Sequence, residues 1–484
     1  MSQTMRFPVG FEVRVRDDVR RLGGPDGRLL VGGSPIRALR LAPAAGRRIV
    51  DGRVRVTDAL SDALAGRLVD ANIADPVLDP PAGPVTAAPT ERGADLTVVV
   101  PVRDRPEQLD RCLAPLRGLR VLVVDDASLE PSAVAKVAAD HGAEVLPLTV
   151  NVGPASARNA GLAQVRTPYV AFVDSDVVAD AAMLVRLARH LADTRVALVG
   201  PLVRSRAVAR RSGGRPRWFE RYDEEVSSLA LGTRACSVEP GAAVGWLPSA
   251  CLVGRVTALR DHPIGGFTEG LRVGEDVDLV WRLVGAGHRV RYDPAEVAHH
   301  DARTTVRDWL GRKLVYGTGG APLAARHGRH GAPAVLTVTG AAAAAAVLVR
   351  RRWSWPIAAA GVGYGWWQLD RRLPEAPDDP GARRLLAGRL AAQGLGWAIR
   401  QESALLLRHW WPLTALLLPS RTVRRAVVTA LLVDTVVAEV EHPGAPYQLL
   451  ARRLDDLAYG AGLWLGALRA RSAACLLPRR PGRR

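Results

Sequence analysis

The chain has few cysteines, and their spacing excludes two kinds of small cross-linked fold. Its 484 residues include four cysteines, none of them in a C-x-x-C pair. The four are Cys112, Cys236, Cys251 and Cys475. Such wide spacing excludes a disulfide framework and the usual structural zinc signatures. Because the first residues also carry no apolar run of the kind found in a secretory signal, we expect a cytoplasmic location.

Lysine is nearly absent, although the chain is strongly basic. The formal net charge is +18, yet only Lys136 and Lys313 among the 66 basic residues are lysine. An excess of arginine along the whole chain is typical of a GC-rich genome and need not mark a binding face, so we expect no nucleic-acid partner. Hydrophobic residues make up 48% and charged residues 24%, which excludes a disordered chain.

Long uncharged runs of low hydrophobicity mark the last third of the chain. Residues 332–349 and Trp353–Leu369 carry no charge, but alanine supplies much of the first run. Eight of the twelve tryptophans lie beyond Gly331, together with 21 arginines against ten acidic residues. Three alternatives remain open: a transmembrane hairpin, attachment to the inner face of the cell membrane, and a buried helical hairpin.

Residues 75–89 are rich in proline, which predicts a linker after a small folded unit. In that unit we expect strands at Phe11–Arg16 and Leu29–Val31 and helices at Pro35–Leu41 and Thr57–Leu68, with Thr57 as the cap of the second helix. The predicted division is a module at 1–75, a linker at 76–93, a catalytic domain at 94–310 and a helical C-terminal region at 311–484.

The middle third predicts a mostly parallel sheet. Apolar runs at Leu96–Val100, Val121–Val124 and Tyr169–Val173 alternate with three segments of helical spacing, at Glu107–Leu116, Pro131–Asp140 and Pro154–Gln164. Polar side chains follow each run, namely Arg103 and Asp104, Asp125 and Asp126, and Asp174 and Asp176. In open α/β sheets the ligand binds at the carboxyl ends of the strands, so these three groups predict one site.

The residue types at that edge indicate what it could bind. The pair Asp174 and Asp176 offers hard oxygen ligands that suit Mg²⁺ or Mn²⁺, which in turn bridges phosphate oxygens. Arg158 follows Gly153 near the start of a predicted helix, a typical place for a pyrophosphate. Glu275 and Asp276 open a later helix, either as favourable charges at its N-terminus or as a general base.

Taken together, these segments resemble family-2 glycosyltransferases of the GT-A fold, from about Leu96 to Asp308. The resemblance rests on six segments in order, Pro101–Asp104, Val124–Ser128, Gly153–Asn159, Asp174–Asp176, Gly265–Phe267 and Gly274–Leu279. The flanking segments Leu30–Pro35, Leu39–Pro43 and Tyr316–His327 look like those of glycosyltransferases of the mycofactocin system. The fold class that this implies is α/β, with a GT-A catalytic domain, a small winged-helix-like N-terminal module and a helical, apolar C-terminal region.

The resemblance also assigns roles to residues. It implies Asp276 as the catalytic base, with Glu275 beside it, and a metal on Asp176. His299 and His300 lie where a ligand of a metal or a phosphate could be, although adjacent histidines are more often structural or exposed to solvent. Of the two, we expect His299 to bind the metal. The residues expected to bind the nucleotide sugar are Pro101, Arg103, Asp104, Asp125, Asp126, Arg158, Asn159, Asp174 and Ser175. Asp104 stands where many relatives have asparagine, and the Q-x-x-R-W sequence of processive polysaccharide synthases is missing after Trp281.

The reaction implied is inverting transfer of a sugar, glucose from UDP-glucose, with Mg²⁺ or Mn²⁺ as cofactor. The acceptor would be a peptide-derived redox cofactor, to which a short glucose chain could be added. The N-terminal module would hold that acceptor through a free edge strand at Phe11–Arg16.

Three other functions compete with this one. The same family also acts on lipid or polysaccharide acceptors of the cell envelope. A phosphohydrolase with Asp174 as nucleophile would need a downstream lysine and a further aspartate pair, and only Lys313 follows, beyond Glu275 and Asp276. A non-catalytic, membrane-attached scaffold would not need this set of carboxylates.

Overall fold

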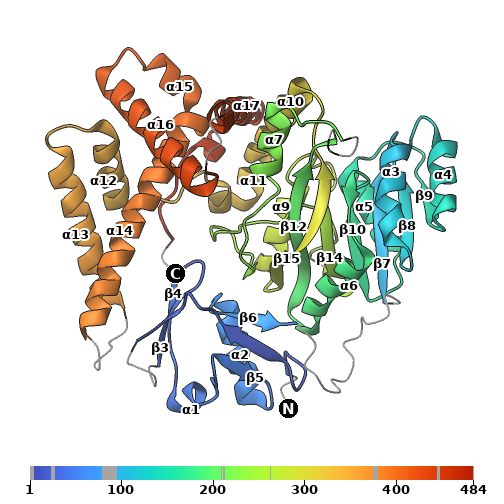
Figure 1. Ribbon diagram of the computed structural model, residues 1–484, viewed down its shortest axis with the longest axis horizontal. Coiled ribbons are helices and arrows are strands. Elements are labelled where there is room, and N and C mark those ends of the chain that lie inside the picture. The colour runs from blue at the N-terminus through green and yellow to red at the C-terminus, as the bar shows by residue number, and fades with distance from the viewer. Residues whose placement is uncertain are drawn as a thin grey trace.

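The computed structural model describes residues 5–22, 28–78, 95–208, 210, 213–261, 263–373, 380–443 and 447–482. Figure 1 shows three regions: a strand-rich N-terminal unit at the bottom, a central sheet with its helices on the right, and a helical region at the upper left. Residues 79–93 of the predicted linker lie outside the described residues.

The N-terminal unit contains two antiparallel sheets of three strands. The first has the order β5-β1-β6, and the second has the order β2-β3-β4. The elements are β1 (Glu12–Val15), β2 (Arg20–Leu22), β3 (Leu29–Gly32), β4 (Arg37–Arg40), α1 (Pro43–Gly46), β5 (Arg53–Arg55), α2 (Ala59–Asp70) and β6 (Ala74–Val77). The apolar side of α2 covers the first sheet, because Leu64 and Leu68 of the helix are buried in one cluster with Val13 and Val54.

Four predictions for this unit were wrong. Residues 37–40 form strand β4 instead of a helix, since they pair with β3. The cap of α2 is Asp58, whose side chain accepts the backbone N–H of Ser61 at 2.8 Å, and not Thr57. Residues 75–77 belong to β6 and not to a linker. Strand β1 is central in its sheet, so its backbone groups are used by β5 and β6 and no free edge exists there.

The N-terminal unit is fixed to the central sheet by buried polar contacts. Arg6 donates through Nε to Asp193 at 2.7 Å, and Arg291 pairs with Asp75 at 2.9 Å. Asn72 is 1% exposed and accepts the backbone N–H of Ser237 at 2.6 Å. These groups would be left buried and without partners if the N-terminal unit moved away. The contacts therefore hold the unit against the central sheet.

The central sheet has the strand order β11-β15-β12-β14-β10-β7-β8-β9, with β13 paired to β15. Strands β10, β7, β8 and β9 run parallel to one another, and β14 is antiparallel to both β10 and β12. The strands are β7 (Leu96–Val102), β8 (Arg120–Asp125), β9 (Glu144–Pro147), β10 (Tyr169–Val173), β11 (Val177–Val178), β12 (Val196–Arg206), β13 (Cys236–Ser237), β14 (Cys251–Arg255) and β15 (Arg289–Asp301). This confirms the predicted, mostly parallel α/β arrangement.

Helices cover both faces of this sheet and bury two apolar clusters. One cluster contains Leu109, Val134 and Leu184 from α3, α4 and α6, and the other contains Leu162 and Leu279 from α5 and α9. The helices are α3 (Pro106–Leu113), α4 (Pro131–Asp140), α5 (Pro154–Gln164), α6 (Ala181–Ala188), α7 (Trp218–Glu225), α8 (Val256–Arg260) and α9 (Glu275–Gly285). The predicted helices at 131–140 and 154–164 are confirmed.

The C-terminal region is helical, as predicted, and packs on α7 of the central part, where Ala451 is buried in one cluster with Phe219 and Tyr222. Its helices are α10 (Val306–Thr318), α11 (Gly320–His327), α12 (Val338–Val349), α13 (Ser354–Arg372), α14 (Pro380–Ala404), α15 (Trp411–Leu416), α16 (Arg421–Glu441) and α17 (Tyr447–Arg469). Helix α10 lies so close to α17 that a Cβ on Gly317 would come within 2.1 Å of the backbone oxygen of Tyr459. Glycine at this position therefore allows the two helix backbones to touch.

The two uncharged runs form α12 and most of α13, which pack against each other. Within the described part of the chain, no helix combines the length and the apolar character needed to cross a membrane. The transmembrane alternative therefore finds no support in these helices.

Candidate active site

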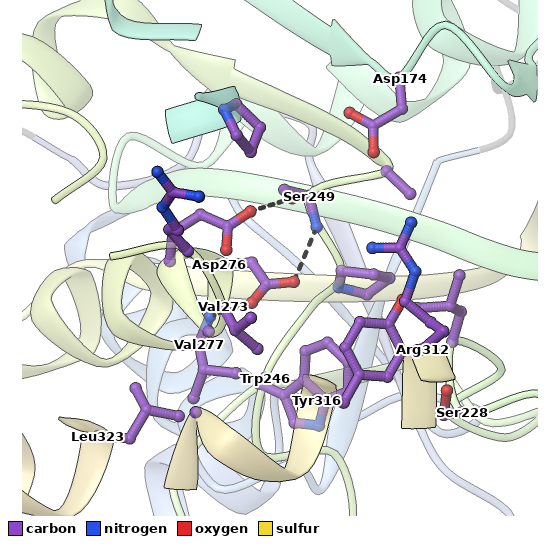
Figure 2. A pocket seen from close by; sticks show the side chains of 18 of the residues that line it. Asp174, Ser228, Trp246, Ser249, Val273, Asp276, Val277, Arg312, Tyr316 and Leu323 are labelled. Carbon is purple, nitrogen blue, oxygen red and sulfur yellow. Dashed lines mark hydrogen bonds between the residues drawn. The ribbon is translucent and has the colours of Figure 1, made fainter. Parts of the chain in front are cut away.

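A cavity of about 980 Å³ opens at the carboxyl ends of the parallel strands. The ends of β7, β8 and β10 line one side, and the start of α9 together with α10 and α11 lines the other. Figure 2 shows Asp174 on one side of Ser249 and Asp276 on the other, with Trp246, Tyr316 and Leu323 gathered beyond Asp276. The polar residues that follow the three apolar runs therefore lie together at this edge of the sheet, and most of them line one cavity.

Asp126 and Asp125 shape the loops beside the cavity. Both carboxylate oxygens of Asp126 accept backbone N–H groups, from Val152 at 2.7 Å and from Gly153 at 2.9 Å. Asp126 lines the cavity, whereas Asp125 accepts from Ser128 and holds the turn after β8. The two neighbouring carboxylates therefore differ in role, and only Asp126 faces the space where a nucleotide could lie.

Arg158 is buried at the base of the cavity and joins its two sides. Its guanidinium donates to Asp174 at 2.5 Å and to Glu275 at 3.2 Å. Burial opposes its charge, but the carboxylates of Asp174 and Glu275 outweigh burial and raise the pKa of Arg158. Because Glu275 also accepts from the Ser249 hydroxyl at 3.3 Å, it is engaged on both sides and acts as a fixed counter-ion.

Asp176 lies beside two arginines and a histidine, which come from two segments of the chain. Its Oδ2 is 3.2 Å from Arg105, 3.6 Å from His300 and 3.8 Å from Arg303. Burial alone would raise the pKa of Asp176, but the charges of His300, Arg303 and Arg105 together hold it below its ordinary value. The carboxylate is therefore kept ionised, which a metal ligand must be.

The side chains at Asp176 fit a divalent cation that takes part of its ligands from outside the chain. His300 directs Nε2 toward Asp176, and its buried Nδ1 has no hydrogen-bond partner within the described residues. Over that same part of the chain, no three His, Cys, Asp or Glu side chains form a complete protein cage. Mg²⁺ is commonly held by one or two carboxylates, with phosphate oxygens and water at the remaining positions, and Asp174 with Asp176 matches that donor set.

Asp276 lies in a different environment, although it adjoins Glu275. Its oxygens accept backbone N–H groups from Val277 at 2.8 Å and Ser249 at 3.3 Å. No ion pair to Asp276 occurs among the described residues, and burial together with the neighbouring charge of Glu275 raises its pKa to about 7. A carboxyl group with this pKa can accept a proton near neutral pH, which is the property of a general base.

The wall beyond Asp276 is apolar and aromatic and comes from the C-terminal helices. Tyr316 of α10 and Leu323 of α11 line it, together with Trp246. Gly274 precedes α9 with φ +81°, and a Cβ there would meet Leu323 at 2.8 Å, so glycine lets α11 approach the catalytic loop. Helix α11 is also tied to α9 by Arg326, whose Nε donates to the buried Asp278 at 2.7 Å.

Most of the predicted site residues come together, and three do not. The predicted residues that line the cavity are Pro101, Arg103, Asp104, Asp126, Arg158, Asp174, Ser175, Asp176, Glu275 and Asp276. Asn159 instead donates to the backbone oxygen of Phe267 at 2.8 Å and anchors that loop, and Asp125 holds the turn described above.

His299, the predicted metal ligand, points away from Asp176. Successive side chains of a strand alternate between its faces, so His300 faces Asp176 and His299 faces the arginines Arg204 and Arg206. The preference for His299 was therefore wrong, and His300, the other histidine considered, takes that place.

Several other residues from distant segments also line the cavity and were not predicted from the sequence. They are Arg105, Trp246, Arg303, Arg312, Tyr316 and Leu323. Arg105 could have been predicted from its position, because it follows the end of the same strand as Arg103 and Asp104. Arg103 and Asp104 pair with each other. The others lie on loops and helices whose distance from the strand ends cannot be read from local patterns.

Comparison with known proteins identifies the chain's relatives. Residues 97–245 match the model of glycosyl transferase family 2. The chain is 42% identical over 485 aligned positions to the pre-mycofactocin glycosyltransferase of Mycobacterium tuberculosis (strain H37Rv), which covers 98% of each protein.

Two more distant similarities were found. An N-acetylglucosaminyltransferase of Mesorhizobium japonicum is 28% identical over 49% of this chain and 56% of its own length. A mannosyltransferase of Pyrobaculum calidifontis, solved with GDP-mannose and Mn²⁺, superposes with a TM-score of 0.42 at 18% identity, covering 79% of this chain and 91% of its own. From the near full-length relative, the chain belongs to the pre-mycofactocin glycosyltransferases of glycosyl transferase family 2.

Proposed function

We propose that the protein transfers glucose from UDP-glucose to a hydroxyl group of pre-mycofactocin, with inversion at the anomeric carbon. One observation carries the proposal: Asp276, with a pKa raised to about 7, lies across Ser249 from Asp174 inside one cavity. Arg158, which pairs with Asp174, lines the same cavity. Such an arrangement holds a base on one side of a reacting centre and charge-stabilising groups on the other. The acceptor follows from the name of the 42% identical relative, and UDP-glucose follows from the family resemblance.

On the donor side, the residues fix the nucleotide and its diphosphate. Asp126 faces the space for the base, and the arginines Arg105, Arg303 and Arg312 surround the place where the diphosphate would lie. Asp174 and Asp176, with His300, would hold Mg²⁺ or Mn²⁺ against the phosphate oxygens. When bound there, the cation supplies positive charge to the leaving diphosphate. The arginines stabilise the same charge as it develops, because their guanidinium groups already lie in the cavity.

On the acceptor side, Asp276 takes the proton of the attacking hydroxyl. The hydroxyl oxygen forms the new bond to the anomeric carbon as the bond from that carbon to the diphosphate oxygen breaks, and the proton moves to the Asp276 carboxylate. Attack opposite the leaving group inverts the configuration. The backbone N–H groups of Val277 and Ser249 hold the carboxylate in place during this step.

The aromatic wall would bind the body of the acceptor. Trp246 and Tyr316 offer flat apolar faces next to Asp276. Such faces stack on the ring of an aromatic group or on the apolar face of a sugar. The same wall can therefore accept pre-mycofactocin first and its glucosylated product next, which is how a short glucose chain would be built.

Mass spectrometry of a donor panel tests the proposal. The purified protein is incubated with pre-mycofactocin, Mn²⁺ and UDP-glucose, UDP-galactose, UDP-N-acetylglucosamine or GDP-mannose in separate reactions. We expect hexose addition with UDP-glucose, further additions at longer times, and a β-linked product by NMR. Preference for another donor would overturn UDP-glucose alone, whereas no addition from any donor would overturn the proposed reaction. The Asp276→Asn variant is the matched inactive control.

A further inference from the structure

Exposed apolar side chains gather where two turns of the helical region meet. Trp355, at the start of α13, is 67% exposed, and Leu416, at the end of α15, is 75% exposed. Further exposed members of this set are Trp353, Ile357, Leu413, Leu417 and Leu418. Leaving large apolar side chains in water is unfavourable, and a contiguous group of them marks an interaction surface.

Contacts between the two turns make them one surface. Arg351, before α13, donates to the hydroxyl of Thr422 at the start of α16 at 2.9 Å. The hydroxyl of Thr429 on α16 donates to the backbone oxygen of Leu348 on α12 at 2.8 Å. Figure 1 shows α12, α13, α15 and α16 together in the upper left part of the molecule. We call this surface, residues 350–357 and 413–425, the tip.

The charge of the tip has one sign. Six arginines flank the apolar side chains, namely Arg350, Arg351, Arg352, Arg421, Arg424 and Arg425. Residues 309–369 and 403–433 contain no aspartate or glutamate, so no acidic side chain lies in either tip segment. Among the described residues, no ion pair neutralises any of the six. A partner for this surface must therefore be both apolar and negatively charged.

We propose that the tip docks the protein on the surface of an anionic phospholipid bilayer. Tryptophan is favoured at the boundary between headgroups and acyl chains, and arginine is attracted to anionic headgroups just outside it. No helix needs to span the bilayer, because the exposed tryptophan and leucine side chains enter only the boundary between the headgroups and the acyl chains. This attachment is independent of the sugar donor and of the acceptor.

Co-sedimentation with vesicles tests the proposal with the full-length chain. We expect binding to vesicles of phosphatidylglycerol and phosphatidylcholine, weaker binding in high salt, and little binding to phosphatidylcholine alone. Neutralising Arg352 and Arg425 in an R352Q/R425Q variant should weaken binding about thirtyfold, at about 1 kcal/mol for each arginine near the surface. The R40Q/R47Q variant removes the same charge from exposed positions of the N-terminal unit and should bind as the parent does.

A second pair of variants tests the apolar part. The W355S/L416S variant should bind about tenfold more weakly or worse. Its matched control is W397S/L385S, because Trp397 and Leu385 are 59% and 68% exposed on α14, outside the tip. Equal binding of the two variants would overturn the proposal. A concentration-dependent dimer that the W355S/L416S change abolishes would overturn it too, since the tip would then bind a second copy of the chain.

Discussion

The two sides of the cavity shift the pKa values of their carboxyl groups in opposite directions. On the donor side, Asp176 lies among Arg105, His300 and Arg303, and these charges hold its pKa low. On the acceptor side, Asp276 accepts backbone N–H groups from Val277 and Ser249, and burial with the charge of Glu275 raises its pKa to about 7. Environments that push two carboxyl pKa values apart suit the groups to the two roles proposed for them: Asp176 stays ionised and can bind a cation, and Asp276 can exchange a proton.

This difference arises from where each side is built. The donor side lies at the ends of the central strands, where charged residues from several segments converge. The acceptor side is closed by Tyr316 and Leu323 from helices that follow the sheet, and these side chains bring apolar surface to Asp276. An apolar wall excludes water, so it raises the pKa of Asp276, and in the proposed reaction it would contact the body of the acceptor.

The largest effect is expected when the base is removed from the acceptor side. Asp276→Asn keeps the shape of the side chain but cannot take a proton, so sugar transfer should fall by about 10²- to 10⁴-fold. UDP-glucose binding, measured by calorimetry with Mn²⁺ present, should stay within about twofold because the donor side is unchanged. Transfer at the parental rate would show that the base lies elsewhere, with Glu275 and Asp278 the next residues to test.

A change on the donor side should give the opposite pattern. Asp176→Asn removes a charged ligand, so the Mn²⁺ concentration for half-maximal rate should rise by about 10- to 100-fold. Nucleotide binding in the presence of Mn²⁺ should weaken with it, unlike in Asp276→Asn. Excess EDTA should stop the parental enzyme, and full activity in EDTA would contradict the metal assignment at Asp174 and Asp176.

The raised pKa of Asp276 predicts how activity changes with pH. Above about pH 7 the carboxyl is ionised and can accept a proton, and below that value it is protonated and cannot. Transfer, measured as kcat/KM for the acceptor, should therefore fall about tenfold for each pH unit below 7 and level off above it. Asp176, with its pKa held low, contributes no step in this range. A flat profile between pH 5 and pH 8 would show that no base of this pKa takes part.

Much of the donor side could be predicted from the sequence, because it depends on strand ends. Apolar runs fix the strands, and the polar residues that follow them must then lie at one edge of the sheet. The helices at 131–140 and 154–164 were predicted to the residue, since a proline marks the first position of each.

The wrong predictions concerned features that depend on contacts between distant segments. The cap of α2 is an exception, because there Asp58, the neighbour of Thr57, takes the capping position. His299 and His300 could not be told apart without the pairing of β15, which decides the face of each. Residues 37–40 became a strand because β3 was available as a partner, which local helical spacing cannot reveal. Tyr316 and Leu323 join the site only because α10 and α11 fold back on the catalytic loop, held there by Asp278 and by the close approach of α17.

The smallest effect is expected at the aromatic wall, where one stacking contact is removed. Tyr316→Ala should raise the KM for pre-mycofactocin about threefold to tenfold, the value of one aromatic contact, while the KM for UDP-glucose and the slow hydrolysis of UDP-glucose stay unchanged. Tyr364→Ala on α13 is the matched control, because Tyr364 is exposed outside the cavity. Tyr316→Phe should restore the parental KM, since the ring and not its hydroxyl makes the contact. If Tyr316→Ala instead impaired UDP-glucose and the acceptor equally, Tyr316 would belong to the donor side and the division of the cavity into two sides would be wrong.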